Sequence, residues 1–363
     1  MGHLHPSSNI NGTVPCFQMF LLHLIRCCWF CCSVELLLFS GVLCIGGAPR
    51  ILTYKVIRTL PHSTTAFTEG LAFRDADGFM IESTGIAGKS FVNVFKVNMT
   101  SNSLETMKTV EFPNGQFGEG LVFHRDHLMT LTWLKNKVNV YDAHTLEFRE
   151  SIPYASEVKE GWGFASDKYG LITSDGSSML HRVVHTPGRV SMETHVRVHD
   201  CYSGMEDVIG LNELETIPPF VSNPESKLHW EYGPPSLEEE FHKSSLNASE
   251  YIWANVISTL CIAVVNPVDG QVKAWVLLDG IYPGWDKTNK VANGIAYRAL
   301  DGTLWVTGKL WNSLFQIELA EHLNPLSVDI KKKCSTSWRL TYNYKESPGY
   351  ASSPEPCNKT VSV

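Results

Sequence analysis

The sequence predicts an all-β fold, and three of its features predict a five-bladed β-propeller behind an N-terminal hydrophobic segment. Beyond residue 50 the chain consists of short runs rich in β-branched and aromatic residues, separated by turn pairs such as Asp77-Gly78. None of these runs has the period of a long amphipathic helix. FTEGLAF at residues 67–73 returns as FGEGLVF at residues 117–123, and such recurrence is typical of repeat folds.

The first 48 residues predict a signal peptide or a signal-anchor. Residues 17–48 carry only two charges, Arg26 and Glu35, over a length that can cross a hydrocarbon core of about 30 Å. The small residues at 40–48 could form a processing site, so that the mature chain starts near Pro49. The flanking charges do not orient the segment, so the sequence leaves cleaved signal and single-pass anchor open.

Both alternatives place the rest of the chain in an oxidising compartment, the lumen of the endoplasmic reticulum or Golgi or the outside of the cell. We therefore expect a glycoprotein that contacts membrane only through its first segment and acts as a monomer. The sequons are at Asn98, Asn247 and Asn358. One or two disulfides are expected among Cys201, Cys261, Cys334 and Cys357, and their pairing cannot be read from the sequence.

The strands of the predicted propeller follow one another from residue 51 to residue 322. The clearest runs are at 52–57, 90–97, 128–133, 137–141, 170–174, 260–266, 271–278 and 303–307. The remaining residues, 323–363, end in a stretch rich in serine and proline and predict a disordered tail.

The repeated heptapeptide belongs to a longer series. EGWGF begins at Glu160, 41 residues after Glu119, and LNELE and NGIAY follow at 211–215 and 293–297. The last interval is lengthened by residues 218–250, an acidic, proline-rich insert without strand period. Without this insert the intervals lie between about 41 and 52 residues, the size of one four-stranded blade. The chain then holds five such units.

A propeller would bring the repeated positions together at one mouth of its central channel, because the innermost strand of every blade lines that channel. The glycines of the series would allow the inner strands to pack closely around the axis. Glu69, Glu119, Glu160 and Asn293 would contribute to a polar ring.

Aromatic residues accumulate near these carboxylates. Phe67 and Phe117 belong to the heptapeptides, and Trp133, Trp162 and Trp253 fall close to a repeat signal. Propellers also use tryptophan to fill the space between blades, so each residue alone fits a core role. Around Glu119, however, they predict an apolar cup, which raises the pKa of a carboxyl group towards the range of proton transfer.

Composition excludes several other classes of protein. Of 363 residues, 44% are apolar and 18% are charged, which suits a large core and not a disordered polymer. The net charge is -7 and the only basic cluster is Lys331 to Lys333, so we expect no nucleic-acid partner. The histidines between 181 and 199 lie on predicted outer strands with polar faces, which favours a solvated surface over a metal site.

At these residues the chain resembles the plant and bacterial type of glutaminyl-peptide cyclotransferase, the glutamine cyclotransferase family. The similarity runs from about residue 51 to residue 320. The segments that carry it, in order, are AFTEGLAF (66–73), IESTGIAGKS (81–90), FGEGLVF (117–123), LTWL (131–134), EGWGFASD (160–167), SDGSS (174–178), LNELE (211–215), YIWANV (251–256), NGIAY (293–297) and VTGKLW (306–311).

The resemblance implies a five-bladed propeller that closes an N-terminal glutamine of a peptide or protein to pyroglutamate and releases ammonia, without a metal or other cofactor. It implies that Glu119 is the general acid/base and that Lys309 and Asn212 contact the substrate and its developing oxyanion. The implied aromatic cage consists of Phe67, Phe117, Trp133, Trp162 and Trp253.

Two departures from the family pattern keep alternatives open. The first repeat commonly contains FTQGL, and this chain has Glu69 at that place; a second carboxylate close to Glu119 would raise the pKa of one of the two. The insert at 218–250 is also foreign to the pattern. The main alternative is therefore a propeller that binds peptides or glycans at the same mouth with impaired turnover. A calcium-dependent lactonase is a third possibility, although a sixth repeat is missing from the sequence.

Overall fold

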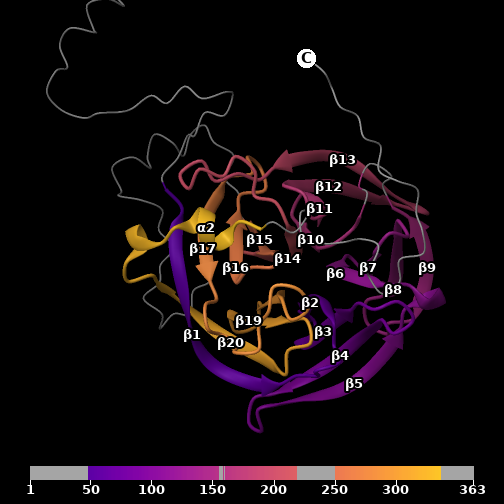
Figure 1. The fold of residues 1–363 in the computed structure, drawn as a ribbon. Coiled ribbons are helices and arrows are strands. Elements are labelled where there is room, and N and C mark those ends of the chain that lie inside the picture. Colours follow the sequence, from indigo (N-terminus) through magenta and orange to yellow (C-terminus); the bar gives the residue numbers. More distant parts are fainter. Residues whose placement is uncertain (1–47, 155–157, 159, 219–249, 337–363) are drawn as a thin grey trace, which may run out of the picture. The chain divides into compact units, whose positions relative to one another are not determined.

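Strands dominate the computed structural model, which describes residues 48–154, 158, 160–218 and 250–336 (Figure 1). The predicted all-β class is confirmed. The elements are β1 (Arg50–Pro61), β2 (Thr68–Arg74), β3 (Phe79–Thr84), β4 (Phe91–Asn98), β5 (Ser103–Glu111), η1 (Pro113–Gly115), β6 (Gly118–His124), β7 (His127–Thr132), β8 (Lys137–Asp142), β9 (Phe148–Pro153), β10 (Phe164–Asp167), β11 (Gly170–Ser174), β12 (Met179–Thr186), β13 (Arg189–Arg197), β14 (Leu211–Ile217), β15 (Tyr251–Val256), β16 (Cys261–Val265), β17 (Val272–Leu277), β18 (Ala292–Arg298), β19 (Thr303–Gly308), β20 (Ser313–Glu321), η2 (Pro325–Ser327) and α2 (Ile330–Cys334).

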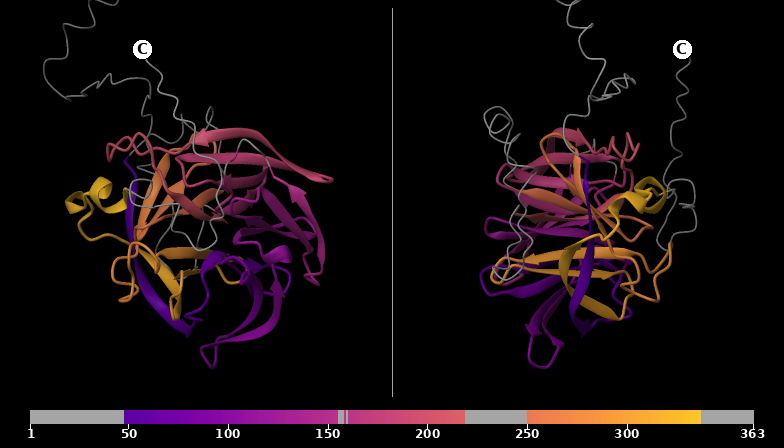
Figure 2. Two further views of the ribbon diagram at one scale, coloured as in Figure 1. Left: turned by 45° about the vertical axis from the view of Figure 1, so that its right-hand side comes forward. Right: turned by 90° about the vertical axis from the view of Figure 1, so that its left-hand side faces the viewer.

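The first three sets of strands, β2–β5, β6–β9 and β10–β13, each form a four-stranded antiparallel sheet in chain order. The other strands form a single eight-stranded sheet with the order β14-β15-β16-β17-β1-β20-β19-β18. This sheet is continuous because β1 pairs in parallel with β17 and antiparallel with β20, and both views of Figure 2 show indigo β1 alongside the orange strands. The described strands thus form four hydrogen-bonded sheets, where the sequence predicts five separate blades.

Each of the first three sets begins with a strand that is more buried than its last strand. All residues of β2 are buried, whereas most of β5 is exposed. In Figure 1, β2, β6, β10 and β14 lie towards the middle of the body and β5, β9 and β13 lie outside. The sequence explains part of this order, because β2 contains the apolar run Leu71–Phe73, whereas β5, SLETMKTVE, carries many charged and hydroxyl side chains.

The first strands of successive sets contact one another: β2 contacts β6, β6 contacts β10, β10 contacts β14, β14 contacts β18, and β18 contacts β2. The repeated glycines make this approach possible. A Cβ on Gly70 would lie 2.7 Å from the Leu121 nitrogen, and one on Gly163 would lie 2.0 Å from the Asn212 carbonyl oxygen. No side chain fits at such distances from backbone, so the predicted role of these glycines is confirmed.

The predicted signal or anchor at 1–48 lies, apart from its last residue, outside the described residues, as do residues 219–249 of the predicted insert. Within the described ranges, no helix combines the length and the apolar character needed to span a membrane.

The C-terminal region differs from the predicted disordered tail, since residues 325–334 contain η2 and the short helix α2. A disulfide joins Cys334 of α2 to Cys261 at the start of β16, and Ile330 is buried beside it. The tether explains the order of this segment. Cys201 is disulfide-bonded as well.

Candidate active site

The polar residues of the repeat lie in β-bulges at the start of the inner strands. The strand register shifts between Thr68 and Gly70, around Glu69, and again between Gly118 and Leu121, around Glu119. The same shift occurs in β14 around Asn212 and in β18 around Asn293. A bulge turns a side chain out of the strand's alternation and is frequent beside functional sites. Here the bulges take these polar residues out of the regular alternation between the two faces of each sheet.

Glu69 is the centre of a buried charged group. Its side chain is 1% exposed; Oε1 accepts a hydrogen bond from the Lys309 ammonium at 2.7 Å and Oε2 accepts one from the Asn293 amide at 3.1 Å. Lys309 follows β19 and reaches Glu69 because the Leu310 nitrogen donates to the Ala66 carbonyl, which ties this turn to the first repeat. Burial raises the pKa of Glu69, and Lys309 and Asn293 offset only part of this effect.

Glu119 is 5% exposed and interacts electrostatically with the nearby Glu69. Burial raises the pKa of Glu119 well above its usual range, and the charges of Glu69 and Glu160 raise it further, while Lys309 lowers it in part. Two close carboxyl groups cannot both ionise without large repulsion. Glu119 is therefore the member of the pair that takes up a proton first as the pH falls, and Glu69 carries the charge that faces Lys309.

Aromatic rings lie beside Lys309 and Glu69. The Lys309 ammonium lies 4.6 Å from the centre of the Phe67 ring. The Phe67 and Phe117 rings meet edge to face at 6.2 Å between centroids, and the Phe117 ring lies 5.3 Å from Trp133. All three rings are only partly buried, so they retain surface that a ligand can contact. We call Phe67, Phe117, Trp133 and Trp162 the aromatic cluster.

Trp133 and Trp162 are linked through Glu160. Its Oε2 accepts hydrogen bonds from the indole nitrogens of Trp133 at 2.9 Å and Trp162 at 3.0 Å. Both indoles pack with Ile257 and Val291. The sequence places Glu160 in the repeat series but gives no sign that it bonds the two indoles.

The other two predicted residues occupy different surroundings. Asn212 is 2% exposed in the bulge of β14, and its backbone carbonyl oxygen accepts a hydrogen bond from the Ser174 hydroxyl at 2.7 Å. Trp253 on β15 is also 2% exposed, and it belongs to the core cluster that contains Ile217 and Tyr251. The structure thus groups the other seven predicted residues around Glu69 and Glu160, and it places Trp253 in the core between strands.

A second buried pair supports the first repeat and has no counterpart among the predicted site residues. Glu82 Oε1 lies 2.9 Å from His62 Nε2 and accepts a hydrogen bond from the Thr68 hydroxyl at 2.7 Å. Burial alone would lower the pKa of His62, but the charge and hydrogen bond of Glu82 raise it above its usual value. Burial likewise opposes ionisation of Glu82, and His62 and Thr68 lower its pKa below the usual value.

The space between the inner strands holds a further acid, Glu213 of β14. Its two oxygens accept hydrogen bonds from the Leu71 nitrogen at 3.4 Å and the Ile295 nitrogen at 2.8 Å. It therefore bridges β14 to β2 and β18. Burial raises its pKa well above the usual range, and Glu215 adds to this effect.

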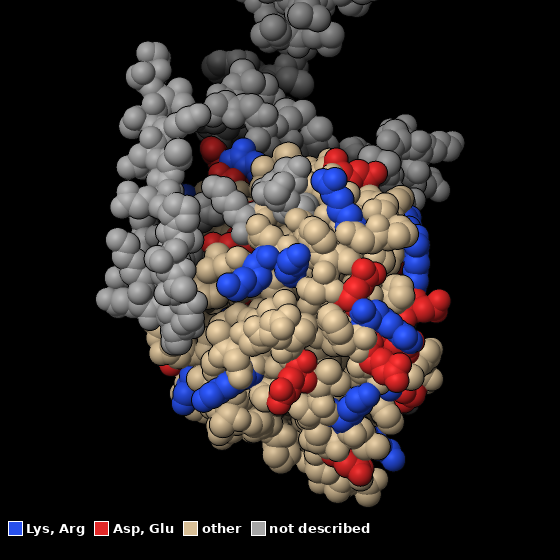
Figure 3. Space-filling model, turned by 90° about the vertical axis from the view of Figure 1, so that its right-hand side faces the viewer, with Lys and Arg blue, Asp and Glu red and all other residues tan. Residues whose placement is uncertain are grey.

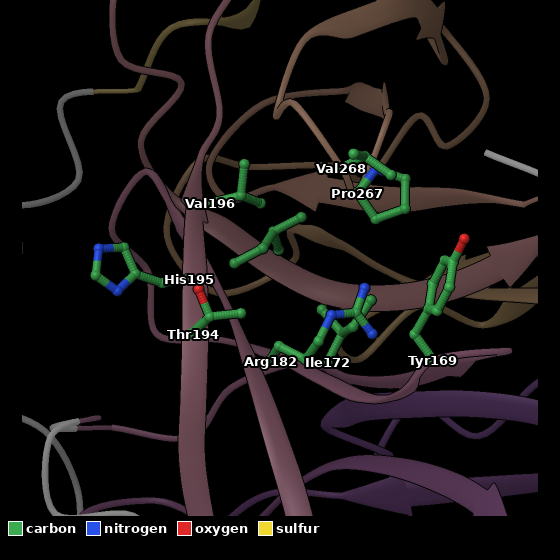
Figure 4. A pocket seen from close by; sticks show the side chains of 9 residues that line it. Tyr169, Ile172, Arg182, Thr194, His195, Val196, Pro267 and Val268 are labelled. Carbon is green, nitrogen blue, oxygen red and sulfur yellow. The ribbon is translucent and has the colours of Figure 1, made fainter. Parts of the chain in front are cut away.

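A groove of about 320 Å³ lies away from these residues, on strands β11–β13 and the turn before β17 (Figure 4). Its lining includes Tyr169, Arg182, His195 and Pro267. The Arg182 guanidinium is already paired with both oxygens of Asp167, so its charge is satisfied. We assign the groove no part in the site.

Neither charge nor metal ligands mark another site in the described part of the chain. On the face in Figure 3, basic and acidic side chains are interspersed. His181, from the histidine-rich stretch, lies 3.1 Å from Asp175. Among the described residues, no group of three or more His, Cys, Asp and Glu has a metal-binding arrangement.

Comparisons with known proteins all lead to glutaminyl cyclotransferases. A family model described as glutamine cyclotransferase matches residues 37–222 and 239–319, and the unmatched stretch lies within the predicted insert. A glutaminyl-peptide cyclotransferase of Arabidopsis thaliana is 33% identical over 289 residues, which cover 78% of this chain and 77% of that protein. The crystal structure of Myxococcus xanthus glutaminyl cyclase matches with a TM-score of 0.57 and 24% identity, covering 76% of this chain and 99% of the other. This last likeness concerns the fold alone.

Proposed function

This chain belongs to the glutamine cyclotransferase family, and on that premise we propose that it converts the N-terminal glutamine of peptides or proteins to pyroglutamate and releases ammonia. The proposal depends above all on Glu119, a buried carboxyl group whose pKa is raised by burial and by the charges of Glu69 and Glu160. A proton acceptor with a pKa moved towards neutrality is what this reaction needs.

We also propose that the five sets of strands are the blades of a β-propeller, with β1 completing the last blade. The contacts of each inner strand with the next, from β2 round to β18 and back to β2, support this arrangement. The position of β1 beside β20 supports it too, because the N-terminal strand then holds the C-terminal set in place.

The proposed reaction starts from the neutral α-amine, whose pKa of about 7.7–8.0 leaves part of it unprotonated at neutral pH. Its nitrogen attacks the side-chain amide carbon of the same residue, and ionised Glu119 accepts one amine proton as the C–N bond forms. Glu119 then returns this proton to the amide nitrogen, which leaves as ammonia. The proton count closes, because the amine loses the one hydrogen that the leaving group gains.

The surrounding residues have separate parts in this proposal. The aromatic cluster would hold the glutamine side chain folded back on its amine, since ring closure of a correctly oriented chain is fast. Lys309 and Asn212 would donate hydrogen bonds to the oxyanion, a contribution of about 2.7–4 kcal/mol for a well-placed donor. An ammonium group has three donors, so the hydrogen bond from Lys309 to Glu69 leaves two of them. Trp253 would support the cage from the core.

The second candidate function is peptide binding with impaired turnover. The ion pair between Glu69 and Lys309 favours it, because the charge intended for the oxyanion is partly neutralised in the free enzyme. In this case the aromatic cluster would still bind an N-terminal residue, and Glu119 would stay protonated.

We infer a compartment of the secretory pathway or the cell exterior, with the protein acting as a monomer. The Cys261–Cys334 disulfide supports an oxidising environment. Asn98, the acceptor of one sequon, is exposed at the end of β4 and therefore accessible to a glycan.

Ammonia release from a glutamine-initiated peptide tests the proposal. The full chain should release one ammonia per peptide, and the same peptide with an acetylated N-terminus should release none. Glu119→Gln should lower kcat by about 10²–10⁴-fold, the range of a general acid/base. Binding of the peptide without ammonia release by the wild type would instead establish the second candidate.

A further inference from the structure

We propose that Glu160 is a positioning residue of this site: its carboxylate fixes the indoles of Trp133 and Trp162 in the orientation that the substrate meets. The proposal rests on the cyclotransferase function proposed above. It adds a residue that binds neither substrate nor oxyanion and acts through two members of the aromatic cluster.

The hydrogen bonds carry the first step. A single oxygen, Glu160 Oε2, accepts from both indole nitrogens, at 2.9 Å and 3.0 Å. An indole has one donor and no acceptor, so each ring has its only polar group committed to the same atom. Hydrogen bonds to an ionised acceptor are stronger than neutral ones. The relative placement of the two rings is therefore set by one side chain.

The backbone supplies the second step, because both tryptophans are anchored to the segment that carries Glu119. The Trp133 nitrogen donates to the Phe117 carbonyl at 3.1 Å, and the Trp162 carbonyl accepts from the Gly120 nitrogen at 2.7 Å. These bonds fix the Cα positions but leave the side-chain torsions free. The hydrogen bonds to Glu160 restrict these torsions by holding the indole nitrogen of each ring.

The space around Trp162 is consistent with a fixed ring. Gly176 has a φ of +74°, and a Cβ there would lie 2.5 Å from the six-membered ring of Trp162. The indole therefore lies flat against a turn that only glycine allows. In this place its nitrogen donates to Glu160.

The charge of Glu160 has a separate effect that the test can use. Burial and the Glu69 charge are larger causes, but Glu160 also raises the pKa of Glu119. Glu160→Gln keeps an acceptor oxygen for the indoles and removes the charge. Glu160→Ala removes both. The two variants thus separate ring placement from electrostatics.

The experiment measures kcat and KM against pH for a glutamine-initiated peptide, together with the ultraviolet resonance Raman band that reports hydrogen bonding of the indole N–H. For Glu160→Ala we expect a lower Raman signal for bonded indoles, a higher KM and a loss of kcat/KM of up to about 10²-fold, as for a misplaced substrate contact. Glu160→Gln should keep the band and most of kcat/KM, with the acid limb of its pH profile at lower pH. Glu105→Ala, at an exposed position on β5, is the matched control and should match wild type.

An unchanged indole band in Glu160→Ala would overturn the proposal, and so would equal losses of kcat/KM in the Gln and Ala variants. If the wild type releases no ammonia, the proposed function fails, but the Raman comparison still decides whether Glu160 holds the rings. The two failures are thus distinguishable.

Discussion

Removing Lys309 tests the buried charge pair on which the candidate site is built. In Lys309→Met, Glu69 keeps its burial and loses its counter-charge. The pair is close, 2.7 Å between Nζ and Oε1, and the two side chains are 10% and 1% exposed. At an effective dielectric constant of about 20 the attraction is about 6 kcal/mol, which the loss of hydration of both ions largely offsets. Breaking such a pair by removing one partner costs about 3–5 kcal/mol.

The cost of Lys309→Met should depend on pH. Burial already raises the pKa of Glu69, and loss of the lysine removes a cause that lowers it. The folded-state pKa of Glu69 then lies above the unfolded value, so the variant loses stability as pH rises from that unfolded value to the folded one. At acidic pH Glu69 takes up a proton and the cost should shrink.

Glu69→Gln and the double variant complete a double-mutant cycle with Lys309→Met. Glu69→Gln should cost less than Lys309→Met, because Glu119 remains as a carboxyl group that can pair with the ammonium. The double variant removes both charges and should recover at least about 2 kcal/mol relative to the sum of the single losses, without recovering activity. Urea denaturation at several pH values measures all four proteins. Additive losses, or a Lys309→Met cost independent of pH, would refute the charge-pair account.

Three further predictions concern the surroundings of the site. Glu69→Gln removes a negative charge that raises the pKa of Glu119, so the acid limb of kcat/KM should move to lower pH; a profile identical to that of wild type would contradict the assigned coupling. Glu82→Gln should destabilise the protein by about 3–5 kcal/mol, chiefly between pH 4.5 and pH 6.5, the usual pKa values of glutamate and histidine. The lowered pKa of Glu82 adds stability above pH 4.5, and the raised pKa of His62 adds stability below pH 6.5. Unfolding measured at pH 3, 5.5 and 9 tests this window. Replacing Cys261 by Ser opens a loop whose ends are 73 positions apart, and the chain-entropy estimate is a loss of about 4 kcal/mol; a thermal midpoint equal to that of wild type would contradict it.

The strands and their turns were predictable because their signals are local. A run such as Lys137–Asp142 has apolar residues at alternate positions, and the strands that pair with it lie a few residues before and after it in the chain. The pairing of β1 was not predictable, because its partners are far away in the sequence. Arg50 lies opposite Ala274 of β17, and Leu52 lies opposite Glu321 of β20. Nothing in the composition of β1 states which distant strand it joins, and this pairing decides whether the last two sets are one sheet or two.

The candidate site was predictable where equivalence between repeats was enough. FTEG and FGEG occupy equivalent places, and Glu69 and Glu119 do come close enough to shift each other's pKa. Equivalence does not settle which residue of LNELE points where, because the bulge in β14 interrupts the alternation between Leu211 and Leu214. Trp253 illustrates a similar limit, since a tryptophan between blades and one in a substrate cage have the same sequence pattern. The register shift in β14 and the packing around Trp253 decide these cases, and both depend on strands that are distant in the sequence.

The repeat also explains why the site needs so many partners for its acids. Equivalent positions converge, so every glutamate kept in the motif meets another carboxylate in a place with little water. Glu69 is balanced by Lys309 and Asn293, and Glu82 by His62. Glu119 has no cation of its own, since Lys309 bonds to Glu69 instead. The group left without a full counter-charge is the one whose pKa rises furthest among these three, and that is the group on which the proposed proton transfer depends.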